Sequence, residues 1–230
     1  MHAGTAEPEV VGALRDAYDG FARVVAALSE EESWLPSGCA GWAVRDLVFH
    51  CVGDAQRGLV ALHTPAAGPP DRDAVTYWAN WQPDTAGSLD ERRWARVGAS
   101  VFPRFAPLRQ LYLTTAAATV TAAERGAGEL RDLVGTQGHV LSAGDLLATL
   151  CVEATVHHLD LIAHLPAATP RPGAAGLAHV RRALDGLLGR AVPVDWSDEE
   201  YALAGTGRSR LTAAERHLLG ADAGRFPLFG

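Results

Sequence analysis

The segment from Ser142 to Leu165 constrains the fold most, because it is long and apolar on nearly every side. Its centre reads Leu146-Leu147-Ala148-Thr149-Leu150-Cys151-Val152. A helix with this composition must be buried, since a helix that is apolar all round needs neighbours on all its faces. Ser142 is a typical N-cap residue for such a helix. The sequence therefore predicts a central, buried helix over residues 142–165.

Four polar residues interrupt this segment along one face. Glu153, His157, Asp160 and His164 are spaced i, i+4, i+7 and i+11, which aligns them in one stripe. An unpaired carboxylate is strongly unfavourable in a core, and a divalent cation would satisfy Glu153 and His157 together. A simple Glu–His ion pair has the same spacing, so both interpretations stay open. A metal site also needs a third ligand from another element.

His50 is the best candidate for that third ligand. It lies within a second apolar helical segment, residues 42–62, and shares its face with Asp46, Asp54 and Arg57. Two histidines and one glutamate leave coordination positions open for water or substrate, as a catalytic site requires. We therefore predict a divalent metal site whose ligands are His50, Glu153 and His157.

Neighbouring polar residues have less defined roles. Asp54 or Asp160 is placed to orient a ligating imidazole from behind. Arg57 either meets an anionic group of a substrate or pairs with Asp54. The segment Tyr77-Trp78-Ala79-Asn80-Trp81 is a hypothetical lining for a pocket that takes an apolar or aromatic electrophile. His158 and His164 are interpreted as structural or exposed.

Helical periodicity recurs along the rest of the chain. Residues 7–29 and 108–124 carry helical patterns, and with 42–62 and 142–165 they predict a four-helix bundle. Alternating strand patterns are almost absent, so the predicted fold class is all-α. Pro166, Pro170 and Pro172 form a hinge before helices at about 174–189 and 197–204 and a short one opened by the capping box at Thr212. We predict a metal-binding bundle over residues 1–166 and a small, mainly helical C-terminal region over residues 167–230, packed on the bundle.

Composition excludes several functions. The formal net charge is -7 and no basic stripe is present, which argues against nucleic acid as a partner. All 20 basic residues are arginine, so Schiff-base chemistry on a lysine is excluded. No apolar run is long enough for a membrane span, and the N-terminus does not resemble a signal peptide. Three cysteines without close spacing favour reduced thiols, and we expect a cytoplasmic protein.

Three stretches resemble a known family. The first is Gly41-Trp42-Ala43-Val44-Arg45-Asp46-Leu47-Val48-Phe49-His50, which looks like the second-helix motif of the mycothiol-dependent maleylpyruvate isomerase family in the DinB-like superfamily. The second runs from Gly144 through Glu153-Ala154-Thr155-Val156-His157-His158-Leu159-Asp160-Leu161 and is similar to the fourth-helix motif. The third includes Gly205-Thr206-Gly207-Arg208 and Arg225-Phe226-Pro227-Leu228, which resemble tails in that family.

The resemblance implies a DinB-like four-helix bundle with a His–Glu–His metal site, usually zinc, whose ligands map onto His50, Glu153 and His157. It also implies mycothiol as cofactor or co-substrate, bound to the metal as a thiolate. The expected activity is S-transfer to a small electrophile, or its isomerisation. Superfamily members are often dimers, so a homodimer is compatible with the resemblance. A metal-dependent hydrolase and a non-catalytic binding or stress-response protein remain as alternatives.

Overall fold

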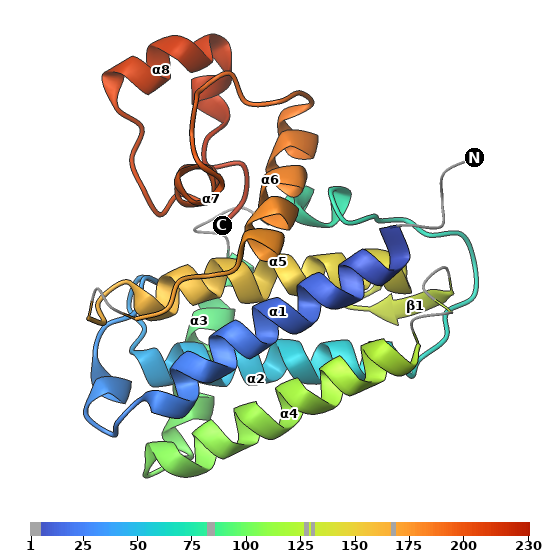
Figure 1. Cartoon of the computed structure of the whole chain (residues 1–230), viewed down its shortest axis with the longest axis vertical. Helices are drawn as coiled ribbons and strands as arrows, with labels where there is room; N and C mark the ends of the chain where they lie inside the picture. The colour runs from blue at the N-terminus through green and yellow to red at the C-terminus, as the bar shows by residue number, and fades with distance from the viewer. Residues whose placement is uncertain (1–5, 82–85, 127–128, 130–131, 167–168) are drawn as a thin grey trace.

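The computed structural model describes residues 6–81, 86–126, 129, 132–166 and 169–230 (Figure 1). Within these residues the chain folds into helices with one small hairpin, which confirms the predicted all-α class. The helices, in chain order, are α1 (Ala6–Ala27), α2 (Val44–Ala61), α3 (Ala86–Ser100), α4 (Phe105–Arg125), α5 (Ala143–Ile162), α6 (Ala174–Leu188), α7 (Asp198–Gly205) and α8 (Ala213–Leu219). The strands are β1 (Leu133–Thr136) and β2 (His139–Ser142).

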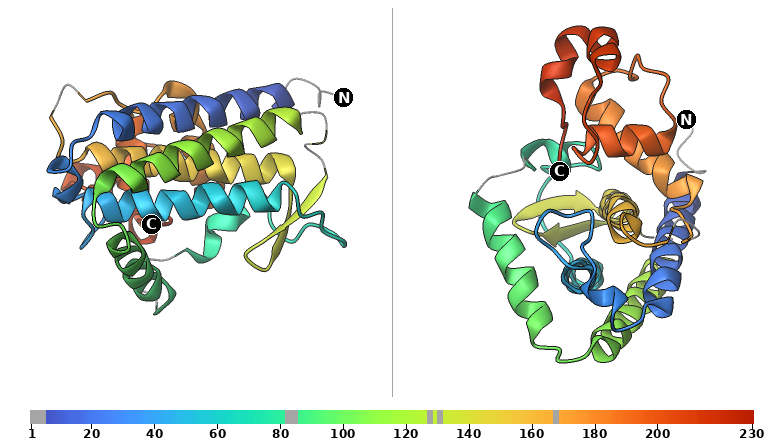
Figure 2. Two further views of the ribbon diagram at one scale, coloured as in Figure 1. Left: turned by 90° about the horizontal axis from the view of Figure 1, so that it is seen from below. Right: turned by 90° about the vertical axis from the view of Figure 1, so that its left-hand side faces the viewer.

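Helices α1, α2, α4 and α5 form the four-helix bundle. Helix α1 packs against α4 and α5, and α2 packs against the same two helices. The left view of Figure 2 shows the four helices running alongside one another, whereas α3 leaves the bundle and contacts α2. Pro103 separates α3 from α4, and Pro107 is accepted in the first turn of α4, where its missing N–H costs no helical hydrogen bond.

Helix α5 is buried on two sides, which explains its almost uniformly apolar sequence. Leu146, Leu150 and Leu161 belong to the core of the bundle, whereas Val152 and Val156 belong to a second apolar cluster under α6 and α7. Figure 1 shows α5 between the bundle and the C-terminal helices. Each polar group on α5 must therefore find a partner inside the protein.

The C-terminal helices approach α5 closely. A Cβ atom at Gly176 of α6 would lie 2.3 Å from Oγ1 of Thr155, so only glycine fits at this contact. The second cluster also includes Trp78 and Phe229, whose rings stack with centroids 4.6 Å apart. Trp78 is only 2% exposed, so it packs in this core and does not line an open pocket. Trp81 lies beside it and is partly buried.

The hairpin is the main feature that the sequence analysis, which found almost no alternating strand pattern, did not predict. Strands β1 and β2 pair antiparallel, with Val134 opposite Leu141. The two central residues of the turn, Gln137 and Gly138, have φ values of 48° and 78°. Both are in the left-handed region, as a two-residue hairpin turn requires. Four residues per strand are too few to show a clear alternating pattern, so the sequence could not reveal them. None of the helices within the described ranges has the length and hydropathy of a membrane span.

Two buried histidines outside the candidate site are expected to make the fold sensitive to acid. Burial lowers the pKa of His158 and of His179 to about 4, well below the value of an unfolded chain. The unfolded chain therefore takes up protons between about pH 6.5 and pH 4 that the folded chain does not. This uptake lowers stability as the pH falls through that window, by on the order of 2–3 kcal/mol for each group.

Denaturant unfolding at pH 7 and pH 4.5 tests this expectation with His158→Gln. The Gln side chain is still able to donate to the carbonyl of Pro170, which lies 3.0 Å from Nε2 of His158. The variant should lose about 2 kcal/mol less than the original protein between the two pH values. Substitution of the exposed His63 by Gln is the control. Equal losses in all three proteins would contradict the assignment.

Candidate metal centre

Helix α2 supplies one half of the candidate site. Ala43, its N-cap residue, has no side-chain acceptor, and the carboxylate of Asp46 accepts the Ala43 N–H at 2.9 Å instead. His50 and Asp54 follow one turn apart on the buried face, with Nε2 of His50 3.2 Å from Oδ2 of Asp54. The ring of Trp42 lies against His50 at a centroid distance of 5.1 Å, which limits the movement of the imidazole.

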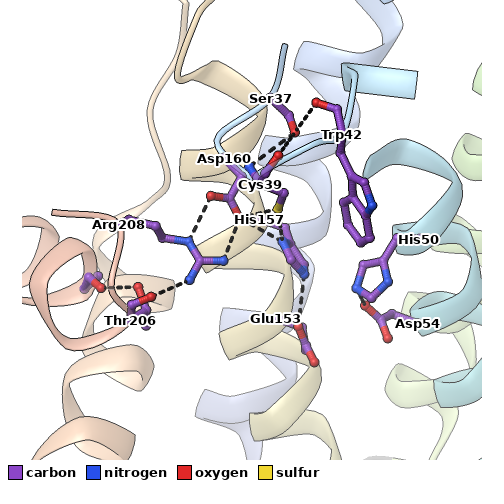
Figure 3. A network of polar contacts seen from close by, with 11 residues as sticks. Ser37, Cys39, Trp42, His50, Asp54, Glu153, His157, Asp160, Thr206 and Arg208 are labelled. Atoms are coloured by element: carbon purple, nitrogen blue, oxygen red, sulfur yellow. Dashed lines mark hydrogen bonds and ion pairs between the residues drawn. The ribbon is translucent and has the colours of Figure 1, made fainter. Parts of the chain in front are cut away.

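Helix α5 supplies the other half. Ser142 caps the helix by accepting the N–H of Asp145 at 3.0 Å, as the sequence predicts. Glu153 and His157 lie one turn apart, with Nε2 of His157 3.3 Å from Oε2 of Glu153. Figure 3 shows this pair facing His50 and Asp54 of α2. The two imidazole rings are 4.8 Å apart and nearly perpendicular.

The ligand atoms of His50, Asp54, Glu153 and His157 all lie within 4.8 Å of one another. In a tetrahedral zinc site with bonds of about 2.1 Å, neighbouring ligand atoms are separated by about 3.4 Å. The separations of 3.2 and 3.3 Å within each helix agree with that geometry. Two imidazoles and two carboxylates are also a donor set that suits a divalent transition metal. The four residues therefore fit a metal ion.

The cluster concentrates charge in the core of the bundle. Burial by itself would lower the pKa of His50 and of His157. For His50, the effect of the Asp54 carboxylate is larger than the effect of burial, so the pKa of His50 is raised. For His157, the hydrogen bond to Asp160 has the same result, and its pKa is also raised. Burial opposes ionisation of Asp54 as well, but the nearby His50 and Arg57 hold its pKa well below the usual range. The carboxylates thus favour a positive charge between them, which a bound cation would provide.

A buried pair behind His157 fixes its orientation. Nδ1 of His157 lies 2.9 Å from Oδ2 of Asp160, which leaves Nε2 directed toward the cluster. Arg208 holds the same carboxylate with two hydrogen bonds, from Nε at 2.9 Å and from Nη2 at 2.8 Å. Arg208 also donates from Nη1 to the carbonyl of Thr206 at 3.0 Å. The C-terminal region thereby contacts the site, as Figure 3 shows.

The loop before α2 closes over the same carboxylate. The N–H of Gly38 donates to the backbone carbonyl of Asp160 at 2.8 Å, and a Cβ atom at Gly38 would lie 2.6 Å from Oδ1. The next residue, Cys39, directs its thiol to Oδ2 of Asp160 at 3.2 Å. Burial raises the pKa of this thiol, so it is held as a neutral donor. Cys39, His157 and Asp160 also bring three possible ligand atoms together. The positive charge of Arg208, which pairs with Asp160, disfavours a cation at this second position.

The structure brings together all three residues that the sequence analysis selected as metal ligands. Of the two residues expected to orient an imidazole, Asp160 lies 2.9 Å from Nδ1 of His157, and Asp54 lies 3.2 Å from Nε2 of His50 and is also close to the other possible ligand atoms. His164 lies beyond the end of α5 and is exposed, so the polar stripe does not extend to it. His158 is structural, as predicted, and the buried Cys51 and Cys151 have raised pKa values because of burial, in agreement with a role in the core.

A cavity adjoins the cluster on the inside of the bundle. It has a volume of about 10 Å³, enough for about one water molecule, and reaches the carboxylates of Asp54 and Glu153. The remaining lining residues come from α1, α2, α4 and α5, and they are Tyr18, Phe21, Cys51, Tyr112, Leu150 and Ala154. The carboxylates therefore have room beside them, inside the bundle, for about one water molecule.

The fold and this cluster define a four-helix bundle with a candidate metal centre between its second and last helices. The comparison with protein families gives a more specific result. Residues 14–162, more than half of the chain, match the model of the mycothiol maleylpyruvate isomerase N-terminal domain. The chain belongs to this family, which confirms the resemblance seen in the sequence and supports the prediction of an enzyme. All four residues of the cluster lie within the matched segment.

Solved structures agree with this assignment at the level of the fold. A crystal structure of the mycothiol-dependent maleylpyruvate isomerase matches with a TM-score of 0.55 and 18% sequence identity, covering 77% of this chain and 69% of the other. A variant of that enzyme with one histidine replaced by alanine matches with the same TM-score and coverage at 17% identity. No curated protein shows a significant match to the chain.

Proposed function

We propose that this protein is a metal-dependent enzyme that uses a low-molecular-weight thiol, mycothiol, for S-transfer to a small electrophile or for its isomerisation. The observation that carries the proposal is the convergence of four ligand atoms from α2 and α5 within 4.8 Å, inside the family-matched segment. His50, Glu153 and His157 would hold the ion and leave a coordination position open for the thiol, with the Asp54 carboxylate beside His50. Zinc suits this donor set.

A bound divalent ion would lower the pKa of a thiol at its open position, so that the sulfur is a thiolate at neutral pH. The protein residues have separate tasks. Asp54 and Glu153 neutralise the charge of the ion, Asp160 keeps Nε2 of His157 directed toward it, and Trp42 packs against His50.

The reaction class follows from the nucleophile. A bound thiolate would supply the nucleophile for a C–S bond to an electrophilic carbon, and the electrophile would take up the displaced electron pair. In a transfer the adduct takes up a proton or expels its leaving group. In an isomerisation the same C–S bond breaks after rotation, and the thiol is regenerated. Both outcomes are compatible with the proposed site.

The location and the domain division are part of the same proposal. The three cysteines are free, which suits the reducing cytoplasm, where a thiol cofactor stays reduced. Residues 1–166 would hold the metal, and residues 167–230 would support it through Arg208, whose guanidinium pairs with Asp160.

Thiol consumption tests the proposal. Zinc-loaded protein is mixed with mycothiol and a panel of small electrophiles, and free thiol is followed over time. We expect consumption or product isomerisation well above the rate without protein. Turnover of the substrate without any thiol would favour the hydrolase instead. No acceleration over background with any thiol would contradict the proposal and favour a non-catalytic binding protein.

A further inference from the structure

The Asp54 carboxylate is buried beside the candidate metal centre and has a free acceptor. Its Oδ2 lies 3.2 Å from Nε2 of His50, and its Oδ1 lies 3.5 Å from Nη2 of Arg57, a contact that is too long for a normal hydrogen bond. Oδ2 is buried and has no hydrogen-bond partner among the residues that the structure describes. A carboxylate offers about four acceptor positions, so Asp54 can still accept a hydrogen bond when an ion is bound beside it.

Tyr18 of α1 carries a hydroxyl that also lacks a partner. The residue is only 4% exposed, and its hydroxyl makes no hydrogen bond within the described part of the chain. Burial raises the pKa of Tyr18, so the hydroxyl is a neutral O–H donor. Among the charged groups Asp54 raises this pKa most, as expected for a hydroxyl on the Asp54 side of the ring. A buried tyrosine hydroxyl usually finds a hydrogen-bond partner.

The small cavity inside the bundle lies between these two groups. Tyr18, Asp54 and Glu153 all line it, and they come from α1, α2 and α5. Its volume of about 10 Å³ suits about one water molecule. A water there would accept the hydrogen of the Tyr18 hydroxyl and donate its own two hydrogens to the two carboxylates. Buried waters typically make about three such hydrogen bonds.

We infer that Tyr18 is a positioning residue for the metal centre and acts through one water bound between its hydroxyl and the carboxylates of Asp54 and Glu153. This inference rests on the proposed metal centre. The residues of the cluster come from α2 and α5, and the water connects them to α1. The water holds the carboxylate of Glu153 in place before the ion binds, and an oriented ligand binds a metal more tightly.

The zinc affinity of a Tyr18→Phe variant tests this inference, because the substitution removes the hydroxyl and keeps the ring. Competition with a chromophoric zinc chelator should show about tenfold weaker binding than in the original protein, since groups that orient metal ligands contribute about ten- to a hundredfold. Tyr201→Phe is the matched control. It removes the hydroxyl of a fully buried tyrosine in the apolar cluster under α6 and α7, and it should leave the zinc affinity unchanged.

A high-resolution crystal structure of the metal-free protein supplies a readout that does not depend on zinc. It should show one ordered water at about 2.6–3.0 Å from the Tyr18 hydroxyl, and this water should be lost in Tyr18→Phe. The inference is overturned if the cavity of the original protein holds no ordered water.

Tyr112→Phe changes the same cavity from α4 and separates the two hydroxyls. A loss of zinc affinity in Tyr112→Phe that equals or exceeds the loss in Tyr18→Phe would contradict the assignment to Tyr18. Equal zinc affinity in the original protein and in Tyr18→Phe would overturn the role of Tyr18 and leave the metal centre in place. Failure of the original protein to bind zinc would contradict the metal centre itself, and the inference with it.

Discussion

Replacement of Arg208 by methionine is expected to destabilise the protein by about 3 kcal/mol at pH 7, because it leaves the Asp160 carboxylate buried without its charged partner. Asp160 is 1% exposed and receives two hydrogen bonds from Arg208. Burial opposes ionisation of Asp160, but Arg208 holds its pKa well below the usual range. Loss of the guanidinium removes that stabilisation, which denaturant unfolding measures.

Arg171→Met is the matched control for this substitution. Arg171 also donates two hydrogen bonds to one carboxylate, that of Glu199, but its side chain is 56% exposed. Solvent screens such a pair, so its loss should cost less than about 1 kcal/mol. Adding Asp160→Asn to the Arg208→Met background should restore part of the stability, because the amide carries no charge. Equal destabilisation by Arg208→Met and Arg171→Met would contradict the importance assigned to the buried pair.

His50→Ala and Glu153→Ala are each expected to lower thiol-transfer activity by more than about a hundredfold. Substitutions that only disturb the orientation of a metal ligand already lower metal affinity or activity by about ten- to a hundredfold, and removal of a ligand should exceed that. The physical reason is that each helix supplies half of the donor set, so either substitution leaves an incomplete site. Steady-state rates with saturating zinc measure the effect.

His164→Ala is the control for these two variants. His164 continues the polar stripe in the sequence, yet it lies beyond α5 and is exposed. We expect its activity to equal that of the original protein. Circular dichroism would show whether each variant keeps its helices. Full activity in a folded Glu153→Ala variant would eliminate the proposed mechanism.

The sequence is sufficient to predict the bundle and to select the proposed ligands on α5, for physical reasons. A segment as apolar as residues 142–165 has to be central, and the polar residues that it tolerates have to be paired with other groups. The one-turn spacing of Glu153 and His157 then fixes their common face. The prediction of His50 as a third ligand follows from the same argument, applied to the apolar segment that forms α2.

The partners that support the ligands could not be predicted in this way. Cys39 and Arg208 both contact Asp160, although they are 121 and 48 residues away in the sequence. Such contacts depend on how the loop before α2 and the C-terminal region fold over the end of α5. The Gly-Thr-Gly-Arg stretch that contains Arg208 resembles family tails, which marks it as a candidate without giving its partner.

The sequence also does not show which of two roles Asp54 has. Helical spacing places Asp54 one turn after His50, which suits a residue that orients the imidazole as well as one that ligates the ion. The packing of α2 against α5 is what brings a carboxylate oxygen of Asp54 within 4.8 Å of the possible ligand atoms of Glu153 and His157. Local periodicity carries no information about that packing.

Metal content of the purified, tag-free protein tests the central claim most directly. Elemental analysis after reconstitution with zinc and removal of free ions should give about one ion per chain, and none in the His50→Ala and Glu153→Ala variants. No bound metal in the original protein after reconstitution would contradict the metal centre. It would leave the fold and the family membership in place and favour a non-catalytic binding protein.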